Sequence, residues 1–182
     1  MTETEIELVR QMQQGNTDAF DQIFELYKNK LFRMAYLISG NYADSEDIVQ
    51  ETFVKCFCSC KNLKDCSSFS SWLYRILTRI AWRYGKKHRR EEPVENLYEN
   101  GEPESNEIPL ELILKNEEQS QIYSAIQCLE QKQRTVIILY YFNQLSTKEI
   151  SRVMGCMEGT VKSRLYTARK NLEHSLGQEV SV

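Results

Sequence analysis

The apolar residues in the first half of the chain recur every three or four positions, which is the period of an α-helix. Three stripes follow this rule: Phe20, Ile23, Phe24, Tyr27, Leu31, Ala35 and Ile38; then Ile48, Val49, Phe53, Cys56, Phe57, Cys60 and Leu63; then Trp72, Leu73, Ile76, Leu77, Ile80 and Ala81. Five glycines stand where such stripes end, as helix caps do: Gly15, Gly40, Gly85, Gly155 and Gly177. No alternating, strand-like pattern competes with these stripes. We therefore predict an all-α protein whose first half is a short leading helix and three longer helices packed together.

Four shorter helices are predicted in the second half, over residues 117–129, 132–142, 147–154 and 158–176. The third of them begins with a capping box, in which Ser146 and Glu149 satisfy each other's backbone donors. Gly155 ends that helix and permits a tight turn. The last helix buries a seam of Val161, Leu165, Ala168 and Leu172. A short capped helix, a three-residue turn and a longer helix are typical of a helix-turn-helix.

The stretch between the two halves has a different composition. It contains all three prolines of the chain, and from Glu91 to Glu118 there are ten Glu and a single Lys. Such a segment cannot bury enough apolar surface to offset its ordering entropy. We predict an acidic flexible linker over residues 91–115, which joins an N-terminal helical bundle (1–90) to a C-terminal helix-turn-helix domain (116–182).

The charge of the chain is strongly segregated. The segment 91–118 carries −9, which leaves +6 for the rest of a chain whose formal net charge is −3. Between Cys66 and Arg90 there is no acidic residue, but there are seven basic ones: Arg75, Arg79, Arg83, Lys86, Lys87, Arg89 and Arg90. Because binding to a polyanion depends on local charge, nucleic acid is the class of partner that this pattern indicates.

The remaining composition is that of a soluble globular protein. Of its 182 residues, 41% are apolar, which is enough for real hydrophobic cores. No apolar run approaches the ~20 residues that a membrane span needs, and the first residues lack the features of a signal peptide. We expect a cytoplasmic protein with no direct membrane insertion, whose six cysteines are reduced.

The exposed side of the last predicted helix has the residue types that read duplex DNA. Arg suits guanine edges, Ser and Thr suit bases or phosphates, and a helix-turn-helix places its second helix in the major groove. An ordinary solvated basic helix is the alternative interpretation. The candidate DNA-binding residues are Thr160, Lys162, Ser163, Arg164, Thr167 and Arg169.

The segment from Ser71 to Arg90 interleaves four aromatic residues with the basic run: Trp72, Tyr74, Trp82 and Tyr84. Aromatic faces stack on unpaired bases while nearby cations follow the backbone, which is the chemistry of single-stranded nucleic acid binding. The alternative is that Trp72 and Tyr74 simply pack their helix against the core.

An acidic helix face is a weaker indication of function than the basic segments. A polar helix face contains Asp44, Asp47, Gln50 and Glu51, but an acidic first turn also suits the helix dipole, so physics alone favours an ordinary exposed helix start.

The chain has only two His, no plausible nucleophile and base pairing and no phosphate-binding Gly-rich loop. We expect neither an enzyme nor a small-molecule substrate, and we predict no cofactor.

Four of the six cysteines fall in CFCSCKNLKDC, from Cys56 to Cys66. On a helix, Cys56 and Cys60 lie about 40° apart while Cys58 lies about 200° from the first, so the three cannot share one ion. A structural zinc site also needs turns and further ligands. Cys56 and Cys60 instead continue an apolar stripe as small hydrophobes, and we predict no metal site. Cys58 and Cys66 remain candidates for reactive thiols.

Taken together and in this order, four segments resemble an extracytoplasmic-function (ECF) sigma factor of bacterial RNA polymerase, in the sigma-70 family. They are DSEDIVQETF, FSSWLYRI, the basic run and LSTKEISRVMGCMEGTVKSRLYTARKNL, the last spanning Leu145 to Leu172. The resemblance implies a polymerase subunit that directs promoter-specific initiation. Its implied partners are core RNA polymerase, promoter DNA as duplex and melted single strand, and an anti-sigma factor.

The resemblance also implies roles for residues. The family docks an acidic, amide-rich helix face on a coiled coil of the polymerase's largest subunit, and the matching residues are Asp44, Asp47, Gln50 and Glu51. A following loop captures a base flipped from the minus-10 element and the next helix supports melting, which points to Lys61, Asn62, Ser67, Trp72, Arg75, Arg79, Trp82 and Arg83. The helix-turn-helix reads the minus-35 duplex through the candidates already named on the last helix.

Two other interpretations stay open. One is a helix-turn-helix regulator that binds an operator, with the N-terminal domain as a sensor. The other is a thiol or metal sensor built on either scaffold. An operator binder would not need a polymerase-facing helix next to the segment from Trp72 to Arg90, so this pairing favours the sigma factor.

Overall fold

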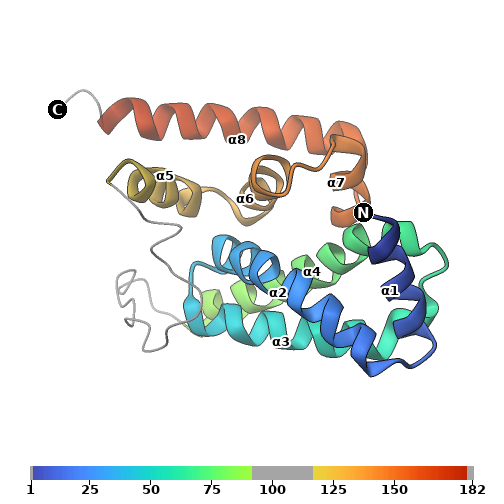
Figure 1. Cartoon of the computed structure of the whole chain (residues 1–182). Coiled ribbons are helices and arrows are strands. Elements are labelled where there is room, and N and C mark those ends of the chain that lie inside the picture. Colours follow the sequence, from blue (N-terminus) through green and yellow to red (C-terminus); the bar gives the residue numbers. More distant parts are fainter. Residues whose placement is uncertain (1, 92–116, 180–182) are drawn as a thin grey trace.

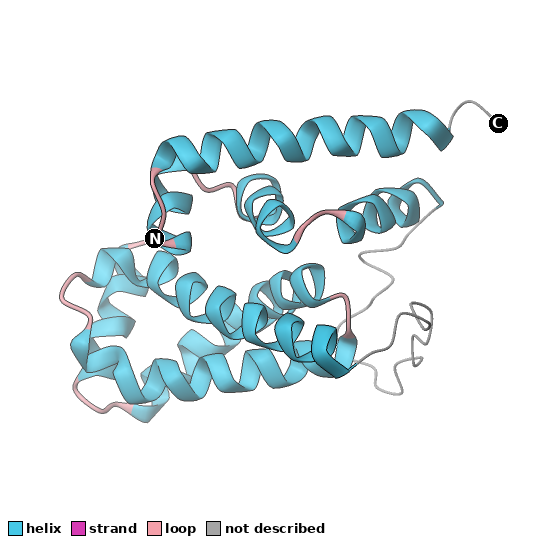
Figure 2. Cartoon of the chain, turned by 180° about the vertical axis from the view of Figure 1, so that it is seen from behind, coloured by secondary structure: helices cyan, strands magenta, loops and turns pink. Residues whose placement is uncertain are grey.

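Helices make up all the regular secondary structure of the residues that the structure, a computed structural model, describes, which are 2–91 and 117–179 (Figures 1 and 2). The first half contains α1 (Glu3–Gln13), α2 (Thr17–Ser39), α3 (Tyr42–Ser59), the 3₁₀ turns η1 (Cys60–Asn62) and η2 (Cys66–Ser68), and α4 (Phe69–Glu91). The second half contains α5 (Glu117–Cys128), α6 (Gln131–Ile137), the π-helix η4 (Ile138–Phe142), α7 (Thr147–Met154) and α8 (Glu158–Glu179). The predicted all-α class is confirmed, whereas the predicted linker, apart from Glu91 at the end of α4, lies outside the described residues.

Side-chain caps fix where the helices of the first half begin. Thr2 forms a capping box with Glu5 at the start of α1, and Asn16 and Asn41 accept from backbone amides at the starts of α2 and α3. Gly40 ends α2 in the left-handed conformation, with φ of 77°. The predicted sequence of one short and three longer helices is therefore confirmed.

Two of the predicted glycine caps are wrong. Gly85 lies within α4 and Gly177 lies within α8, so neither glycine ends its helix. A glycine costs a helix only about 1 kcal/mol, which the turns around it can offset. At Gly85 the lack of a side chain has a packing role, because a Cβ there would lie 2.4 Å from Nε2 of Gln131 on α6.

The helix-turn-helix of the second half has the predicted form. Ser146 and Glu149 form both hydrogen bonds of the capping box, and Gly155 ends α7 with φ of 65°. Val161, Leu165 and Ala168 of α8 are buried as predicted. The helix predicted over 132–142 differs in detail, because its last turn is the π-helix η4.

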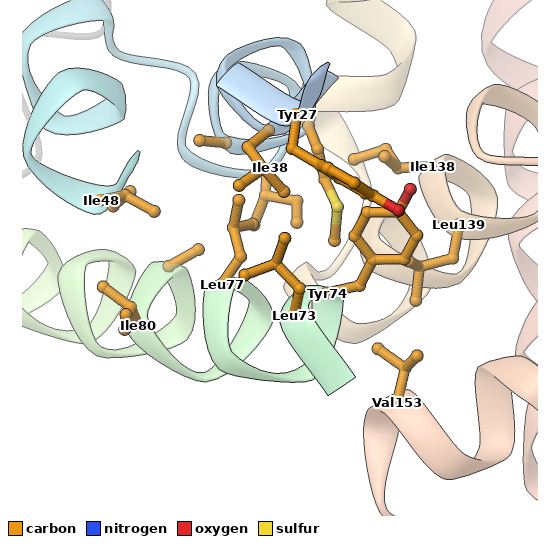
Figure 3. Packing of buried hydrophobic residues seen from close by; sticks show 14 of the residues in the cluster. Tyr27, Ile38, Ile48, Leu73, Tyr74, Leu77, Ile80, Ile138, Leu139 and Val153 are labelled. Atoms are coloured by element: carbon orange, nitrogen blue, oxygen red, sulfur yellow. The ribbon is translucent and has the colours of Figure 1, made fainter. Parts of the chain in front are cut away.

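The two halves pack on one another through a continuous group of buried side chains. Figure 3 shows Tyr74 of α4 among Ile138 and Leu139 of η4 and Val153 of α7. The Tyr74 side chain is 1% exposed. The interpretation that Tyr74 packs its helix against a core is therefore the correct one, and that core is shared between the halves.

Polar groups join the halves at the C-terminal end of α2. Nη1 of Arg134 donates to the carbonyl of Ile38 at 3.0 Å, and Nε2 of Gln127 donates to the carbonyl of Leu37 at 2.9 Å. Arg134 also donates to Oε1 of Gln127 at 2.6 Å and to the carbonyls of Gln127 and Leu129. The end of α2 would otherwise leave carbonyls without intrahelical donors, and α5 and α6 supply them.

The last helix lies on the far side of the molecule from the first half. Figures 1 and 2 agree that α5 and α6 lie between α8 and the bundle of α1 to α4. Because its buried residues pack toward α5, α6 and α7, the exposed side of α8 points away from the bundle. Within the described ranges, no helix is long and apolar enough to cross a membrane.

Candidate nucleic-acid interface

A stripe of cations runs along the outer side of α4. Arg75, Arg79 and Arg83 recur every four residues and are all exposed, so they lie on one face of the helix. Trp72 stands one turn before Arg75 and is half-buried against Phe69, with ring centroids 5.8 Å apart. The structure thus brings four of the predicted melting residues together on one surface.

Trp82 has a different environment from these residues. Its indole Nε1 donates to Oγ1 of Thr135 on α6 at 2.9 Å, and its ring is half-buried between the two halves. Tyr84 is half-buried near Arg83, whose guanidinium lies 6.0 Å from the ring centroid. Burial raises the pKa of Tyr84, and the carboxylates of Asp47 and Glu51 raise it further. Trp82 would therefore have to leave Thr135 to offer its whole ring to DNA.

The loop between α3 and α4, residues 60–68, presents polar side chains to solvent. Lys61 and Asn62 on η1 are exposed, as is Ser67 on η2. The carboxylate of Asp65 accepts from the backbone N–H of Ser67 at 3.0 Å and from its hydroxyl at 2.7 Å. These two hydrogen bonds lower the pKa of Asp65. The three predicted loop residues therefore lie exposed on two successive turns of one loop.

No sequence pattern connects this loop with Gln13, the last residue of α1. Nε2 of Gln13 donates to the carbonyl of Cys60 at 2.8 Å and to that of Leu63 at 2.7 Å. Its Oε1 accepts from the thiol of Cys66 at 3.5 Å. Contacts between a side chain and a distant backbone carbonyl leave no mark on hydrophobic periodicity, so no sequence pattern could have found them.

The acidic face of α3 lies next to the cationic stripe of α4. Asp47 and Gln50 are exposed, and Asp44 is half-buried. Glu51 forms an ion pair with Arg83 of α4, and its other oxygen lies 2.9 Å from Nζ of Lys55. The hydrogen bond from Arg83 is the main cause of a lowered pKa of Glu51. One predicted protein-binding residue is therefore paired with one predicted melting residue.

An apolar groove adjoins this acidic face. Its volume is about 510 Å³, and it is lined by Phe20, Phe24, Gln50, Phe53, Val54, Phe57 and Cys58. The prediction that Phe57 belongs to a buried stripe is wrong, because its side chain is 50% exposed. Phe57 lies at the edge of the α2 and α3 contact, where its ring meets Phe20 edge-on at 5.2 Å.

On α8, four of the six predicted DNA-binding residues are exposed. These are Lys162, Ser163, Thr167 and Arg169, while Thr160 and Arg164 are half-buried. Glu158 at the start of the helix accepts from the hydroxyl of Thr147 at 2.8 Å and lies 2.9 Å from Nζ of Lys162. These two partners lower the pKa of Glu158. The hydrogen bond from Thr147 also joins the start of α8 to the start of α7.

The two predicted arginines of α8 have partners within the protein. Nη1 of Arg164 lies 3.7 Å from the sulfur of Cys156 in the turn before α8. Nε of Arg169 donates to the hydroxyl of Tyr141 at 2.9 Å, and its guanidinium lies over the rings of Tyr140 and Tyr141. Arg164 thus lies against the turn, and Arg169 connects α8 to η4.

The cysteines have the predicted exposures. Cys56 is fully buried and Cys60 is 2% exposed, while Cys58 is exposed and Cys66 is half-buried. Burial raises the pKa of the Cys56 thiol to about 12. Cys60 lies in η1 rather than in α3, because the α-helix ends at Ser59. Among the residues described, no group of three or more His, Cys, Asp and Glu could hold a metal ion.

Comparison with known protein families gives two matches along the chain. Residues 23–91 match the family "Sigma-70 region 2", and residues 119–172 match "Sigma-70, region 4". The first match covers most of α2, all of α3 and α4 and the loop between them, and the second covers the helix-turn-helix. Together they include every residue predicted above to bind polymerase or DNA.

Several curated proteins are similar over nearly the whole chain. The ECF RNA polymerase sigma factor SigW of Bacillus subtilis is 30% identical, over 92% of this chain and 94% of that protein. The ECF RNA polymerase sigma-E factor of Haemophilus influenzae is 31% identical over 95% of each. The RNA polymerase sigma-H factor of Pseudomonas aeruginosa is 29% identical, over 96% of this chain and 94% of that protein.

Two solved structures have a similar fold. The sigma factor RpoE of Bartonella quintana, in complex with the anti-sigma factor NepR, has a TM-score of 0.68 at 25% identity, over 87% of this chain and 96% of that one. CnrH in complex with the cytosolic domain of CnrY has a TM-score of 0.70 at 23% identity, over 96% of this chain and 97% of that one.

Proposed function

This chain belongs to the ECF sigma factors of bacterial RNA polymerase, and on that premise we propose how its described surfaces divide the work of initiation. Residues 1–90 act as the domain that binds core polymerase and melts the minus-10 element, and residues 116–182 read the minus-35 element. The observation that carries this division is the placement of the exposed cations of α4 and the exposed face of α8 in different halves of one chain.

Core polymerase docks on the acidic face of α3 in this proposal. Asp47 and Gln50 offer exposed acceptors and an amide, and Asp44 and Glu51 flank them. Carboxylates on a rigid helix suit a basic partner helix, and charge complementarity raises the association rate and fixes the register. The adjoining acidic and apolar surfaces of α3 have the mixture of polar rim and apolar centre that protein interfaces have.

Melting of the minus-10 element is assigned to the loop and α4. Arg75, Arg79 and Arg83 contact the phosphates of the separated strand, since an exposed cationic stripe follows a backbone. Lys61, Asn62 and Ser67 receive the flipped base, whose capture offsets part of the few kcal/mol that unstacking costs. Trp72 and Trp82 stack at the boundary between duplex and single strand, and Trp82 does so after leaving Thr135.

The minus-35 element is read by α8 in the major groove. Lys162, Ser163 and Thr167 lie on its exposed side, and Thr160 stands near its start, where a recognition helix meets base edges. Arg169 lies two turns after Lys162 on the same side of the helix, where it also contacts Tyr141, and Arg164 reaches the DNA from beside Cys156. No catalytic group is assigned, because the reaction is carried out by the polymerase.

Regulation by an anti-sigma factor is the second part of the proposal. Its support is that the Bartonella quintana RpoE, 25% identical to this chain, was solved in complex with the anti-sigma factor NepR. We place the action of the chain in the cytoplasm, where polymerase and promoter DNA meet.

Reconstitution with core RNA polymerase tests the function. The chain is expected to bind core and to initiate only at promoters mapped from transcript starts after its forced expression. Asp47→Lys should abolish core binding and leave minus-35 duplex binding intact, whereas Glu46→Lys, an equal charge reversal at an exposed neighbour, should have little effect on either. A chain that never associates with core would contradict the proposal.

A further inference from the structure

The side chain of Gln13, which belongs to none of the proposed polymerase-binding or DNA-binding surfaces, contacts three points of the loop between α3 and α4. Both N–H groups of the Gln13 amide are used, at 2.8 Å on the carbonyl of Cys60 and at 2.7 Å on that of Leu63. The amide oxygen accepts from the thiol of Cys66 at 3.5 Å. Gln13 therefore contacts the loop at the start, in the middle and at the beginning of η2.

The helix that carries Gln13 is itself fixed on the core. Val9 is fully buried and Met12 is 2% exposed, so the last two turns of α1 are packed. At its other end, the hydroxyl of Tyr27 on α2 donates to Oε1 of Glu5 at 3.4 Å. The Gln13 amide is consequently a fixed point rather than a mobile surface group.

The opposite side of the same loop is open. Lys61, Asn62 and Ser67 are exposed, and the loop's own backbone closes only short-range bonds, such as Leu63 N–H to the Cys60 carbonyl at 3.0 Å. On its inner side the loop is thus held by the Gln13 amide and by the packing of Cys60, Leu63 and Cys66 against the core, while its outward groups are available to a ligand. A loop that must order itself on binding loses affinity, and a loop already ordered does not.

We propose, resting on the function proposed above, that Gln13 is a positioning residue for minus-10 recognition. It holds residues 60–68 in the shape that receives the flipped base, and it does not touch the DNA. Loss of its hydrogen bonds should weaken binding of the unpaired minus-10 strand roughly tenfold. This factor corresponds to the free energy of about one hydrogen bond. Core binding and minus-35 binding should not change.

The test uses holoenzyme made from the full chain and core polymerase, with fork promoters whose minus-10 non-template strand is unpaired. A series of these DNAs carries an abasic site at one position each, and the position whose loss weakens wild-type binding marks the captured base. Gln13→Ala should bind the intact strand about tenfold more weakly and should show little further loss at that abasic position. Gln14→Ala, at the exposed C-cap residue that follows α1, should behave as wild type.

The abasic comparison separates positioning from general destabilisation. A chain that is merely less folded binds every DNA of the series more weakly by the same factor and retains the full abasic loss, so retention of that loss in Gln13→Ala would overturn the inference. Gln13→Met fills the same volume without hydrogen bonds and gives the same readout if Gln13→Ala fails to fold. A wild-type chain with no abasic-sensitive position would instead overturn base capture itself, and the role of Gln13 with it.

Discussion

Arg83 on α4 forms an ion pair with Glu51 on α3, and the two residues belong to surfaces with different proposed partners. Glu51 lies on the acidic face proposed to meet polymerase, and Arg83 ends the cationic stripe proposed to meet DNA. A basic group of polymerase that approaches Glu51 competes with Arg83 for the same carboxylate. In the proposed function, docking on core and release of Arg83 for DNA are therefore linked through this one ion pair.

Removal of Arg83 should return the pKa of Glu51 toward its ordinary value. The lowered pKa means that the pair contributes stability above the ordinary value of 4.5 and loses it as the pH falls through the folded-state pKa. Arg83→Ala should therefore lower the free energy of unfolding slightly at pH 7 and not at pH 3. NMR titration of the Glu51 carboxyl measures the shift directly, and Arg79→Ala, on the same face of α4, should leave it unchanged.

Opening of the two halves should follow from the loss of Arg134. Arg134→Met removes the hydrogen bonds to the carbonyls of Ile38, Gln127 and Leu129 while keeping much of the side-chain volume. Small-angle scattering should then give a larger radius of gyration than the about 16 Å of a compact chain of this length. Lys132→Met, at an exposed position of α6, is the control, and identical scattering of both variants would contradict the role of Arg134.

The capping box of α7 should carry a measurable part of the stability of the helix-turn-helix. Ser146→Ala removes the acceptor for the Glu149 backbone N–H and should cost about 1 kcal/mol of unfolding free energy, measured by denaturant titration. It should also raise the lowered pKa of Glu149, because hydrogen bonds from Ser146 are the main cause of that shift. Glu149→Gln keeps an acceptor at this position and should cost less. A larger cost for Glu149→Gln than for Ser146→Ala would mean that the charge of Glu149 matters more than the cap.

Thiol alkylation should distinguish the cysteines of the segment from Cys56 to Cys66. At pH 8 the exposed Cys58 should react first with iodoacetamide, and Cys66 should react more slowly. Cys56 should stay unmodified in the folded chain, because its thiol is buried and has a pKa of about 12. Peptide mass spectrometry after timed quenching gives the order, and early modification of Cys56 would show that α3 opens readily.

Substitutions at different residues of α8 should have different effects on minus-35 binding. Lys162→Ala removes an exposed cation and should reduce the salt dependence of minus-35 binding by about one ion, with little effect on sequence preference. Arg164→Ala should weaken minus-35 duplex binding while core binding remains. Fluorescence anisotropy over a range of salt concentrations measures both, and loss of polymerase association in Arg164→Ala would contradict the division of roles between the domains.

Local signals in the sequence were sufficient for the helices. The bounds of α7 were predicted correctly because Ser146, Glu149 and Gly155 mark both ends by backbone chemistry. The prediction that Gly85 and Gly177 end their helices was wrong, because a glycine within a helix costs little stability once neighbouring turns pack. The π-helix at the end of α6 was missed because the chain there is apolar on all sides, and its period could not be read.

The candidate site was predictable only where a pattern lies along the sequence. The cationic stripe of α4 and the exposed face of α8 follow from helical spacing. The pairing of Trp82 with Thr135, the bonds of Gln13 to the loop and the bond of Arg134 to Ile38 join segments 47 or more residues apart, and no periodicity reports them. The shared core around Tyr74 could not be predicted either, because the apolar residues of each half fit the pattern of a separate domain equally well.

The bonds that complete α2 also set an order of events during synthesis. The carbonyl of Ile38 and the guanidinium that binds it are 96 residues apart, so at about 5–20 residues per second the ribosome delivers Arg134 roughly 5–20 s after Ile38. During that interval the N-terminal bundle emerges with the end of α2 hydrated and the surface around Tyr74 uncovered. A nascent chain of this protein therefore passes through a stage in which that apolar surface is accessible to chaperones, and completion of α6 and α7 ends it.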